Sequence, residues 1–343
     1  MIPFGYPPME MRSVSDVPTG PQWQYEPKWD GFRCLAFRDG REVALQSKAG
    51  QPLGRYFPEI AEALARLPAK RFVLDGELVV PFAGALSFDA LQQRIHPAAS
   101  RVAMLAKKTP AWYLVFDLLD ENGDELIELP LGTRRTRLEA FAAAFDGATL
   151  RLSPATRDRA VVDDWFARVG GALDGVIAKR ADAAYASGSR EAAVKVKRVR
   201  TADCVLGGFR YAKGSTTQVG SLLLGLYDDD GMLDYIGFCS AFSAEEKKAL
   251  IERLRPHIGE PGFSGAAPDT APSRWDRGND RDKSYVKLKN DLVLEVAFDQ
   301  VTGGRIRHGT RPVRWRTDKA PRQCTLEQLA TPDRALALLD DGP

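Results

Sequence analysis

The stretch Glu26-Pro27-Lys28-Trp29-Asp30-Gly31-Phe32-Arg33 places a lysine at the end of an apolar strand, two residues before a carboxylate and a glycine. A lysine amine, with an ordinary pKa of about 10.4, is a poor nucleophile near neutral pH unless it is desolvated or set among other cations. Trp29 and Arg33 supply both conditions. We therefore interpret Lys28 as a candidate nucleophile, and Asp30 as a residue that orients the amine or holds a metal.

Length and composition predict an ordinary globular protein of two domains. The chain has 343 residues, of which 44% are apolar and 27% charged. It carries neither an N-terminal targeting pattern nor an apolar run long enough for a membrane span, so we expect no membrane association and a cytoplasmic location. Its four cysteines lie far apart, which argues against a zinc ribbon or a disulfide framework and favours buried free thiols.

The net charge of +2 conceals an uneven distribution. Residues 190–213 hold seven Lys/Arg against two acids, and residues 274–322 hold thirteen against seven. The rest of the chain is therefore acidic. A basic C-terminal surface favours a polyanionic partner, with nucleic acid first among the candidates, although a solvated face of a strand-rich domain would look similar.

The first part of the chain, residues 1–200, reads as an α+β domain with antiparallel strands and flanking helices. Arg38-Asp39-Gly40-Arg41 predicts a hairpin turn, and Pro58 opens a helix to about Leu67. Asp75-Gly76-Glu77 interrupts an apolar strand, a violation of strand propensity that tends to mark a functional position. In Val194-Lys195-Val196-Lys197, a period of two puts both lysines on one strand face.

Residues 201–343 read as a small β-barrel. Short strands separated by glycine-rich turns, with one helix that begins at the capping box Ser243-Ala244-Glu245-Glu246, fit an OB-fold. The segment from Pro256 to Pro272 is a loop that contacts the nucleic acid or is an inert insertion. Near the end, Arg314-Trp315-Arg316-Thr317-Asp318-Lys319 interleaves cations with an aromatic residue.

These stretches, in this order, resemble the motifs of the covalent nucleotidyltransferase superfamily of ATP-dependent DNA ligases, RNA ligases and mRNA-capping enzymes. The resemblance spans nearly the whole chain and is nearest to small bacterial ATP-dependent DNA ligases of the LigC type, which are related to the ligase module of bacterial end-joining enzymes. The stretches that carry it are Lys28-Trp29-Asp30-Gly31, Ser47-Lys48-Ala49-Gly50, Asp75-Gly76-Glu77, Phe116-Asp117, Asp174-Gly175-Val176-Ile177-Ala178-Lys179, Lys195-Val196-Lys197 and Arg316-Thr317-Asp318-Lys319.

The resemblance implies an adenylation domain followed by an OB-fold domain, and a DNA ligase that uses ATP with Mg²⁺ or Mn²⁺. It also implies that Lys28 attacks the α-phosphate of ATP, that the AMP passes to the 5′-phosphate of a nick in duplex DNA, and that the 3′-hydroxyl then expels it. We expect a monomer acting in DNA repair. The repair pathway and protein partners are not implied.

The implied site residues fall into groups by role. Asp30 acts on the metal and the nick in the later steps, and the nucleotide contacts also include Lys48 and Lys179. Glu26 recognises the adenine amino group, and Phe116 stacks on the base. Glu77 contacts the ribose or the metal, Asp174 is a metal ligand, and Arg33 contacts the nucleotide or nick phosphate. Lys195 and Lys197 neutralise the α-phosphate, whereas the residues that act on the pyrophosphate are Arg316, Asp318 and Lys319.

Three features depart from the family pattern. Lys48 stands where arginine is usual, which removes a bidentate fork, Asp174 stands where glutamate is more common, and the usual aromatic residue of the Lys195-Val196-Lys197 motif is absent. The alternative function is an RNA ligase or RNA-capping enzyme, which shares the lysine chemistry. A catalytically silent nucleic-acid-binding protein is a further alternative. The chain lacks the glycine-rich motifs of dehydrogenases and P-loop kinases, and its three histidines make a histidine-based triad a poor interpretation.

Overall fold

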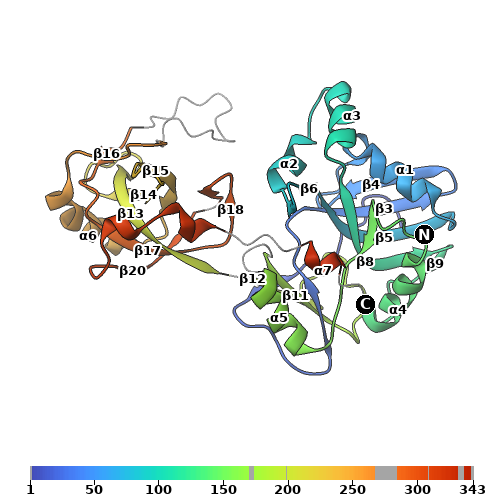
Figure 1. The fold of residues 1–343 in the computed structure, drawn as a ribbon. Helices are drawn as coiled ribbons and strands as arrows, with labels where there is room; N and C mark the ends of the chain where they lie inside the picture. The colour runs from blue at the N-terminus through green and yellow to red at the C-terminus, as the bar shows by residue number, and fades with distance from the viewer. Residues whose placement is uncertain are drawn as a thin grey trace. The chain divides into compact units, whose positions relative to one another are not determined.

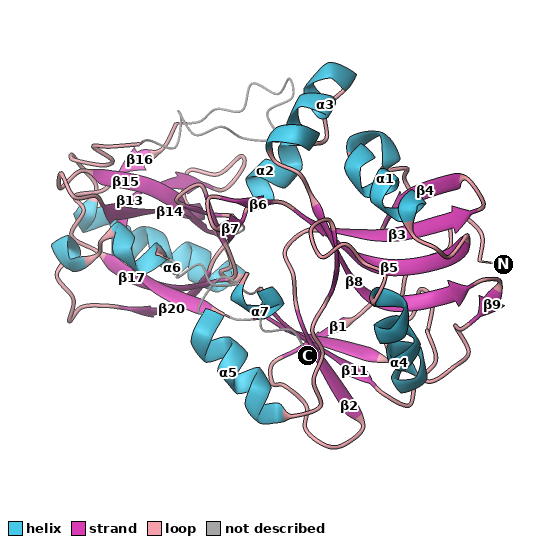
Figure 2. Ribbon diagram, turned by 45° about the vertical axis from the view of Figure 1, so that its right-hand side comes forward, coloured by secondary structure: helices cyan, strands magenta, loops and turns pink. Residues whose placement is uncertain are grey.

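The computed structural model describes residues 2–169, 174–197, 199–266, 284–307, 309–330 and 336–340. The chain divides into two compact units, one of Met1–Arg198 with Thr331–Pro343 and the other of Val199–Ala330 (Figure 1). The first unit contains two larger sheets with helices packed against them, and the second contains one larger sheet with a helix (Figure 2).

The larger sheet of the first unit has six strands, and its main path runs β10-β8-β5-β3-β4. Neighbouring strands on this path are antiparallel, except that β10 runs parallel to β8. The predicted hairpin is confirmed, because β3 and β4 pair from Asp39↔Glu42 and Gly40 has a φ of +61°. The strands are β3 Phe32–Asp39, β4 Glu42–Ser47, β5 Arg71–Val79, β8 Trp112–Glu121, β10 Leu150–Leu152 and the short β9 Asp124–Glu125, which pairs with β8.

One face of this sheet is covered by apolar helix residues. Ile60, Ala63 and Leu64, which recur at helical spacing in α1, are buried in a core that also holds residues of β3, β5 and α4. The helices are α1 Pro58–Arg66, α2 Phe88–Gln93, α3 Ala99–Lys108, α4 Leu131–Ala142 and α5 Arg159–Val169, and a small hairpin is formed by β6 Pro81–Phe82 and β7 Ala85–Leu86. The sequence predicts that Ser87 caps a short helix through Ile95. Ser87 does cap α2, by accepting a hydrogen bond from the Ala90 amide at 3.2 Å, and the helix ends at Gln93.

The second sheet of the first unit has the order β1-β12-β11-β2. Strand β12 runs parallel to β1 and antiparallel to β11, which is also antiparallel to β2. Apolar residues of one face, among them Tyr25 and Val176, are buried in a core with Val162 and Trp165 of α5. The strands are β1 Arg12–Val14, β2 Trp23–Pro27, β11 Gly175–Arg180 and β12 Ala193–Lys197.

The second unit is built on a six-stranded sheet whose main path runs β15-β14-β13-β17-β20 with antiparallel neighbours. The two ends of the path meet, because Thr310, just before β20, forms a parallel bridge with Cys239 of β15 and donates from its amide to the Phe238 carbonyl at 3.2 Å. The strands are β13 Arg200–Tyr211, β14 Val219–Tyr227, β15 Leu233–Cys239, β17 Val293–Phe298, β20 Arg311–Trp315, β16 Val286–Lys287 beside β13, and the separate pair β18 Val301–Thr302 and β19 Arg305–Ile306.

Helix α6, Ala244–Leu254, begins at the predicted capping box, with Ser243 and Glu246 each bonded to the backbone amide of the other. Its residues Leu250 and Leu254 are buried in the core of the second unit. All four cysteines are buried free thiols, as expected. No helix in the described part of the chain is long and apolar enough to cross a membrane.

Two expectations about the second part of the chain need comment. The predicted second domain extends to residue 343, whereas helix α7, Ala337–Asp340, belongs to the first unit, where Leu338 is buried in the core that holds Tyr25 and Trp165. Apolar burial thus assigns this helix to the first unit. Residues 267–272 of the predicted loop lie outside the described residues.

Gly76 provides a test of close packing in β5. An added Cβ would lie 2.5 Å from the Tyr113 ring and 2.6 Å from the Leu114 carbonyl oxygen, so we expect Gly76→Ala to destabilise the protein by about 1–3 kcal/mol. The matched control is Gly54→Ala, because a Cβ there meets no atom within 4 Å. Urea unfolding monitored by tryptophan fluorescence measures both changes. Equal unfolding midpoints for the two variants would contradict this reading of β5.

Candidate functional site

The sheet β1-β12-β11-β2 carries its polar side chains on one face. Register places Gln24 opposite Lys179, and Ile177 between Glu26 and Lys195. Because successive strand side chains point to opposite faces, the polar residues lie on the face away from Tyr25 and Val176. This polar face is formed by Gln24, Glu26, Lys179, Lys195 and Lys197.

Lys28 follows β2 directly and lies at the end of this face. Its amide donates to the Gly175 carbonyl at 3.0 Å, and its Nζ forms an ion pair with Asp174 Oδ2. The side chain of Lys28 is 19% exposed and that of Asp174 4%. Asp174 Oδ1 is buried and has no hydrogen-bond partner among the described residues. The predicted nucleophile therefore lies beside a carboxylate that retains an unused oxygen.

Gly175 is the residue that allows this approach. Its φ is +145°, and a Cβ at this position would collide with the Val196 carbonyl oxygen of β12. The sequence Asp174-Gly175 thus brings Asp174 to the edge of the strand that carries Lys195 and Lys197.

Phe116 of β8 lies among charged groups from both sheets. Lys179 Nζ is 4.4 Å from the centroid of its ring, and the Arg33 guanidinium carbon is 4.7 Å from it. Lys179 also pairs with Glu26 at 2.6 Å, and Glu26 Oε1 accepts from Gln24 Nε2 at 2.9 Å. The structure therefore brings together Glu26 and Phe116, which the sequence assigns to the base, and Lys179, which it assigns to the nucleotide.

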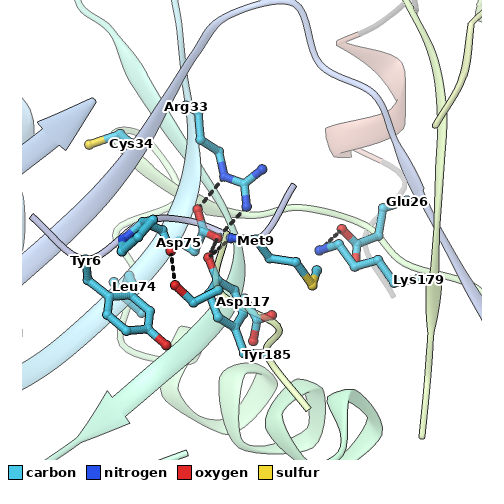
Figure 3. A network of polar contacts seen from close by, with 12 residues as sticks. Tyr6, Met9, Glu26, Arg33, Cys34, Leu74, Asp75, Asp117, Lys179 and Tyr185 are labelled. Atoms are coloured by element: carbon cyan, nitrogen blue, oxygen red, sulfur yellow. Dashed lines mark hydrogen bonds and ion pairs between the residues drawn. The ribbon is translucent and has the colours of Figure 1, made fainter. Parts of the chain in front are cut away.

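Arg33 is held by a buried carboxylate. Its Nε and Nη2 donate to the two oxygens of Asp75, each at 2.5 Å, and Tyr185 Oη donates to Asp75 Oδ2 at 2.6 Å (Figure 3). Burial acts to lower the pKa of Arg33, but Asp75 raises it well above its ordinary value. The predicted phosphate contact is therefore a permanently charged group with a fixed partner.

Two further pKa shifts describe the electrostatics of the site. Burial lowers the pKa of Lys195, and the nearby charges of Lys28 and Lys197 lower it further. Burial raises the pKa of Glu77 to about 8 despite the opposing charges of Arg33 and Lys28. The site thus gathers cations in a poorly solvated region, an arrangement that favours an anionic ligand.

Lys48 lies at the periphery of this group. Its side chain is 61% exposed and pairs with Glu10 at 3.1 Å, while Arg190 pairs with the other oxygen of Glu10 at 2.6 Å. The hydrogen bonds from Arg190 and Lys48 lower the pKa of Glu10. Lys48 adds to the positive field that acts on Lys195, after the nearer charges of Lys28 and Lys197.

The predicted cationic cluster of the second unit is an ion-pair network around Asp203. Arg316 Nη1 donates to both oxygens of Asp203 at 2.8 and 2.9 Å, and Lys319 Nζ lies 3.1 Å from Asp203 Oδ2. The other side of Arg316 donates to both oxygens of Asp318 at 2.9 Å. The hydrogen bonds from Arg316 lower the pKa of Asp318 to about 2. All three residues predicted for this motif therefore lie together.

Sequence reasoning assigned no role to four residues that hold these groups: Gln24, Asp75, Tyr185 and Asp203. Asp75 carried a signal, because an acid inside an apolar strand needs a partner. Asp203 carried the same signal in β13. Gln24 and Tyr185 carried no such signal. The hydrogen-bond partner of Gln24 is Glu26 of the same strand, and that of Tyr185 is Asp75 of β5, a contact that the sequence alone does not specify.

Family comparisons agree with this arrangement. The family model described as ATP dependent DNA ligase domain matches residues 10–197, and the one described as ATP dependent DNA ligase C terminal region matches residues 215–319. The two matches include every residue assigned to the site by sequence. The first match ends beside the boundary between the two compact units, and the second begins within the second unit.

Named proteins are similar over most of the chain. DNA ligase C2 of Mycolicibacterium smegmatis is 45% identical over 340 residues, covering 95% of this chain and 94% of that protein. DNA ligase C of Mycobacterium tuberculosis is 43% identical over 342 residues, with coverage of 95% and 94%. A solved structure from a study of Lig E DNA ligases is 15% identical with a TM-score of 0.55, covers 90% of this chain and 99% of that one, and supports the fold alone. The chain belongs to the ATP-dependent DNA ligase family.

Proposed function

We propose that this protein seals nicks in duplex DNA through a lysyl-AMP intermediate on Lys28. The observation that supports this most directly is the ion pair of Lys28 with Asp174 next to the lysines of β12, within a chain of the ATP-dependent DNA ligase family. The alternative, joining or capping of RNA, has no support from the named relatives, which are DNA ligases. We further propose that it acts as a monomer.

The first step is a displacement at the α-phosphorus of ATP. Lys28 Nζ gives up a proton to its partner Asp174 and attacks, so that an N–P bond forms as the bond to pyrophosphate breaks. Lys195 and Lys197 neutralise the α-phosphate, because they lie on the sheet face that Lys28 adjoins. Positioning and charge neutralisation dominate such transfers.

The next two steps are further displacements at phosphorus. A 5′-phosphate oxygen of the nick attacks the lysyl-AMP and releases Lys28, and the 3′-hydroxyl then attacks that 5′-phosphorus and expels AMP. Asp30 serves these later steps. Arg33 supplies the fixed guanidinium that contacts a phosphate, with Asp75 holding its Nε and Nη2 edge.

Adenine is recognised by the charged group around Phe116. Glu26 accepts a hydrogen bond from the exocyclic amine of adenine, a donor that guanine lacks at the same ring position. Glu26 is held for this by Gln24 and Lys179. The ring of Phe116 stacks on the base, and because Lys179 and Arg33 both approach that ring, their side chains adjust to admit the purine.

The carboxylates of the site fit a divalent cation, Mg²⁺ or Mn²⁺. Among the described residues there is no group of three or more His, Cys, Asp or Glu that could hold a metal. Mg²⁺, however, is commonly bound through one or two carboxylates together with substrate phosphates. Asp174, with its buried and unpartnered Oδ1, and Glu77 would hold it. When bound, the ion supplies charge neutralisation at the phosphates.

We also propose that the second unit is an OB-fold barrel. Its strand path β15-β14-β13-β17-β20, closed by the parallel bridge between Cys239 and Thr310, has the antiparallel order and the parallel closure that such a barrel requires. Arg316, Asp318 and Lys319 act on the pyrophosphate leaving group. To do so, Arg316 exchanges its exposed partner Asp318, and Lys319 its partner Asp203, for phosphate oxygens.

Replacement of Lys28 tests the nucleophile directly. We expect parent protein incubated with α-labelled ATP and Mg²⁺ to become labelled and to seal nicked duplex DNA. Lys28→Ala and the charge-conserving Lys28→Arg should do neither, because no amine remains at the site of attack. Lys108→Ala removes a lysine of α3, outside the site, and serves as the control. Label that remains on the Lys28 variants, or labelling of the parent by GTP but not ATP, would overturn the mechanism.

Replacement of Asp30 tests whether this residue acts in the later steps rather than in self-adenylation. We expect Asp30→Ala to slow the sealing of pre-adenylated nicks by about tenfold or more, with a smaller effect on self-adenylation, because its role lies in metal and nick chemistry. Single-turnover assays of both reactions give the comparison. Normal sealing of pre-adenylated nicks by this variant would show that Asp30 has no such role.

Glu77 should make stability depend on pH. Its pKa of about 8 in the folded protein lies above the ordinary value of 4.5 in the unfolded chain, so folding takes up a proton between these values. The contribution of Glu77 to stability is present below about pH 4.5 and is lost as the pH rises towards 8. Glu77→Gln stays neutral throughout.

The free energy of unfolding of the parent minus that of Glu77→Gln should therefore decrease across this pH range. Urea unfolding at a series of pH values measures the difference. Glu62→Gln, at an exposed position of α1, is the matched control for loss of a carboxylate. A parent-minus-Glu77→Gln difference that does not change with pH would contradict the raised pKa.

A further inference from the structure

Asp75 is a buried carboxylate whose hydrogen bonds converge from two directions. Its side chain has 0% exposure, and it accepts two hydrogen bonds from Arg33 and one from the Tyr185 hydroxyl. A buried ion pair is stable only if its remaining lone pairs are also satisfied. The Tyr185 hydroxyl supplies that third bond at 2.6 Å.

The direction of this chain of hydrogen bonds is fixed. The Met9 amide, which can only donate, bonds to the oxygen of Tyr185 at 3.0 Å, so the hydroxyl proton is directed to Asp75 (Figure 3). The Tyr185 ring is itself fixed, because Tyr6 stacks on it at 6.3 Å and the Arg134 guanidinium carbon lies 5.6 Å from its centroid. Tyr185 is thus a rigid donor.

Because Asp75 is held in one position, it also fixes the side chain of Arg33. The bidentate pair fixes the plane of the guanidinium, since the two N–H groups and the two carboxylate oxygens are coplanar in this geometry. Asp75 accepts hydrogen bonds from Nε and Nη2, so Nη1 is the guanidinium nitrogen that can contact a phosphate. The Arg33 guanidinium carbon lies 4.7 Å from the centroid of the Phe116 ring, and Arg33 lies opposite Glu77 in the pairing of β3 with β5.

We propose that Tyr185 is a positioning residue for ligation, whose hydroxyl acts through Asp75 to fix the Arg33 guanidinium for contact with the nucleotide or nick phosphate. This inference rests on the proposed function of Arg33. Tyr185 lies between β11 and β12, far in sequence from Arg33. Its only role in the chemistry is through the orientation of that side chain.

Tyr113 provides a matched comparison. It is a buried tyrosine of the same unit, and its hydroxyl donates to the backbone carbonyls of Cys34 at 2.9 Å and Leu74 at 3.2 Å. Removal of that hydroxyl costs buried hydrogen bonds, as does removal of the Tyr185 hydroxyl, but it takes no hydrogen bond from Asp75. Tyr113→Phe therefore controls for loss of stability alone.

A double-mutant cycle in single-turnover assays tests the proposal. The proteins are the parent, Tyr185→Phe, Arg33→Ala and the double variant, with Tyr113→Phe as control and thermal unfolding to verify folding. We expect Tyr185→Phe to slow self-adenylation or sealing of pre-adenylated nicks by about tenfold with little change in the apparent affinity for ATP, a coupling of about 1.4 kcal/mol. In the Arg33→Ala background the same change should have almost no effect, and Tyr113→Phe should keep the parent rates.

The outcomes separate the inference from the function it rests on. Parent rates in Arg33→Ala would remove Arg33 from the proposed mechanism. Two results would overturn the positioning role while leaving Arg33 in the mechanism, both with slow reaction rates in Arg33→Ala. In one, Tyr185→Phe lowers the rate equally in the parent and in the Arg33→Ala background. In the other, Tyr185→Phe does not lower the rate in the parent.

A second measurement does not depend on residual activity. In protein labelled with ¹⁵N-arginine, the Nε–H of Arg33 should exchange slowly with solvent because it is bonded to Asp75. Tyr185→Phe should accelerate this exchange and Tyr113→Phe should not. Unchanged Arg33 exchange in Tyr185→Phe would contradict the proposal even if the enzyme were slower.

Discussion

The period of two in strands β2, β11 and β12 is the constraint on which the site depends. Tyr25, Val176 and Val194 lie on one face of these strands and fill one core, while the charged residues Glu26, Lys179, Lys195 and Lys197 occupy alternate positions. The charged residues are thereby forced to the opposite face. A shift of register by one residue would bury Lys195 and Lys197 in that core and expose its apolar residues. The same apolar packing that stabilises the sheet therefore fixes which lysines adjoin Lys28.

Gly175 allows a close approach of β11 to β12 that the alternation of side chains alone does not produce. Its positive φ and missing Cβ let the start of β11 lie against Val196, so Asp174 precedes a strand that is already paired on both edges. Lys28 then bonds through its backbone to Gly175 and through its side chain to Asp174. Backbone geometry and ion pairing thus act on the same two segments, although they are far apart in sequence.

The parts of this protein that sequence predicts are those that local chemistry determines. The hairpin at Gly40, the cap at Ser87 and the capping box at Ser243 follow from turn and cap preferences, and all three are present. Helix α3 was not predicted, because its buried face rests on only Val102 and Leu105 while Met104 is exposed. Its start also carries no capping side chain, since the N-cap residue is Ala98.

The candidate site shows the same division. Lys28, Lys195 and Lys197 could be grouped from motif order, and the structure places them around one sheet face. The supports of the site could not be predicted, because the contact between Tyr185 and Asp75 depends on how the segment between β11 and β12 packs against β5. Neither residue has a local pattern that specifies its partner. Contacts between buried polar groups that are distant in sequence therefore cannot be predicted from a single sequence.

Burial separates the ion pairs of this protein into two kinds. Asp75 is fully buried with Arg33, and the pair of Arg134 with Asp117 has 1% exposure on each side chain. Breaking such a pair would leave an unpaired charge in a poorly solvated region, so these pairs are fixed supports. Asp318, by contrast, is 63% exposed in its pair with Arg316.

An exposed pair adds little stability, because water and salt compete with its partners. Arg316 can therefore leave Asp318 at small cost and take a phosphate oxygen in its place. The pair of Lys28 with Asp174 lies between these limits, with a lysine 19% exposed and a carboxylate whose Oδ1 has no hydrogen-bond partner in the described part of the chain. In the proposed mechanism Lys28 is held by Asp174 until it attacks and is then released, and an intermediate degree of burial satisfies both requirements.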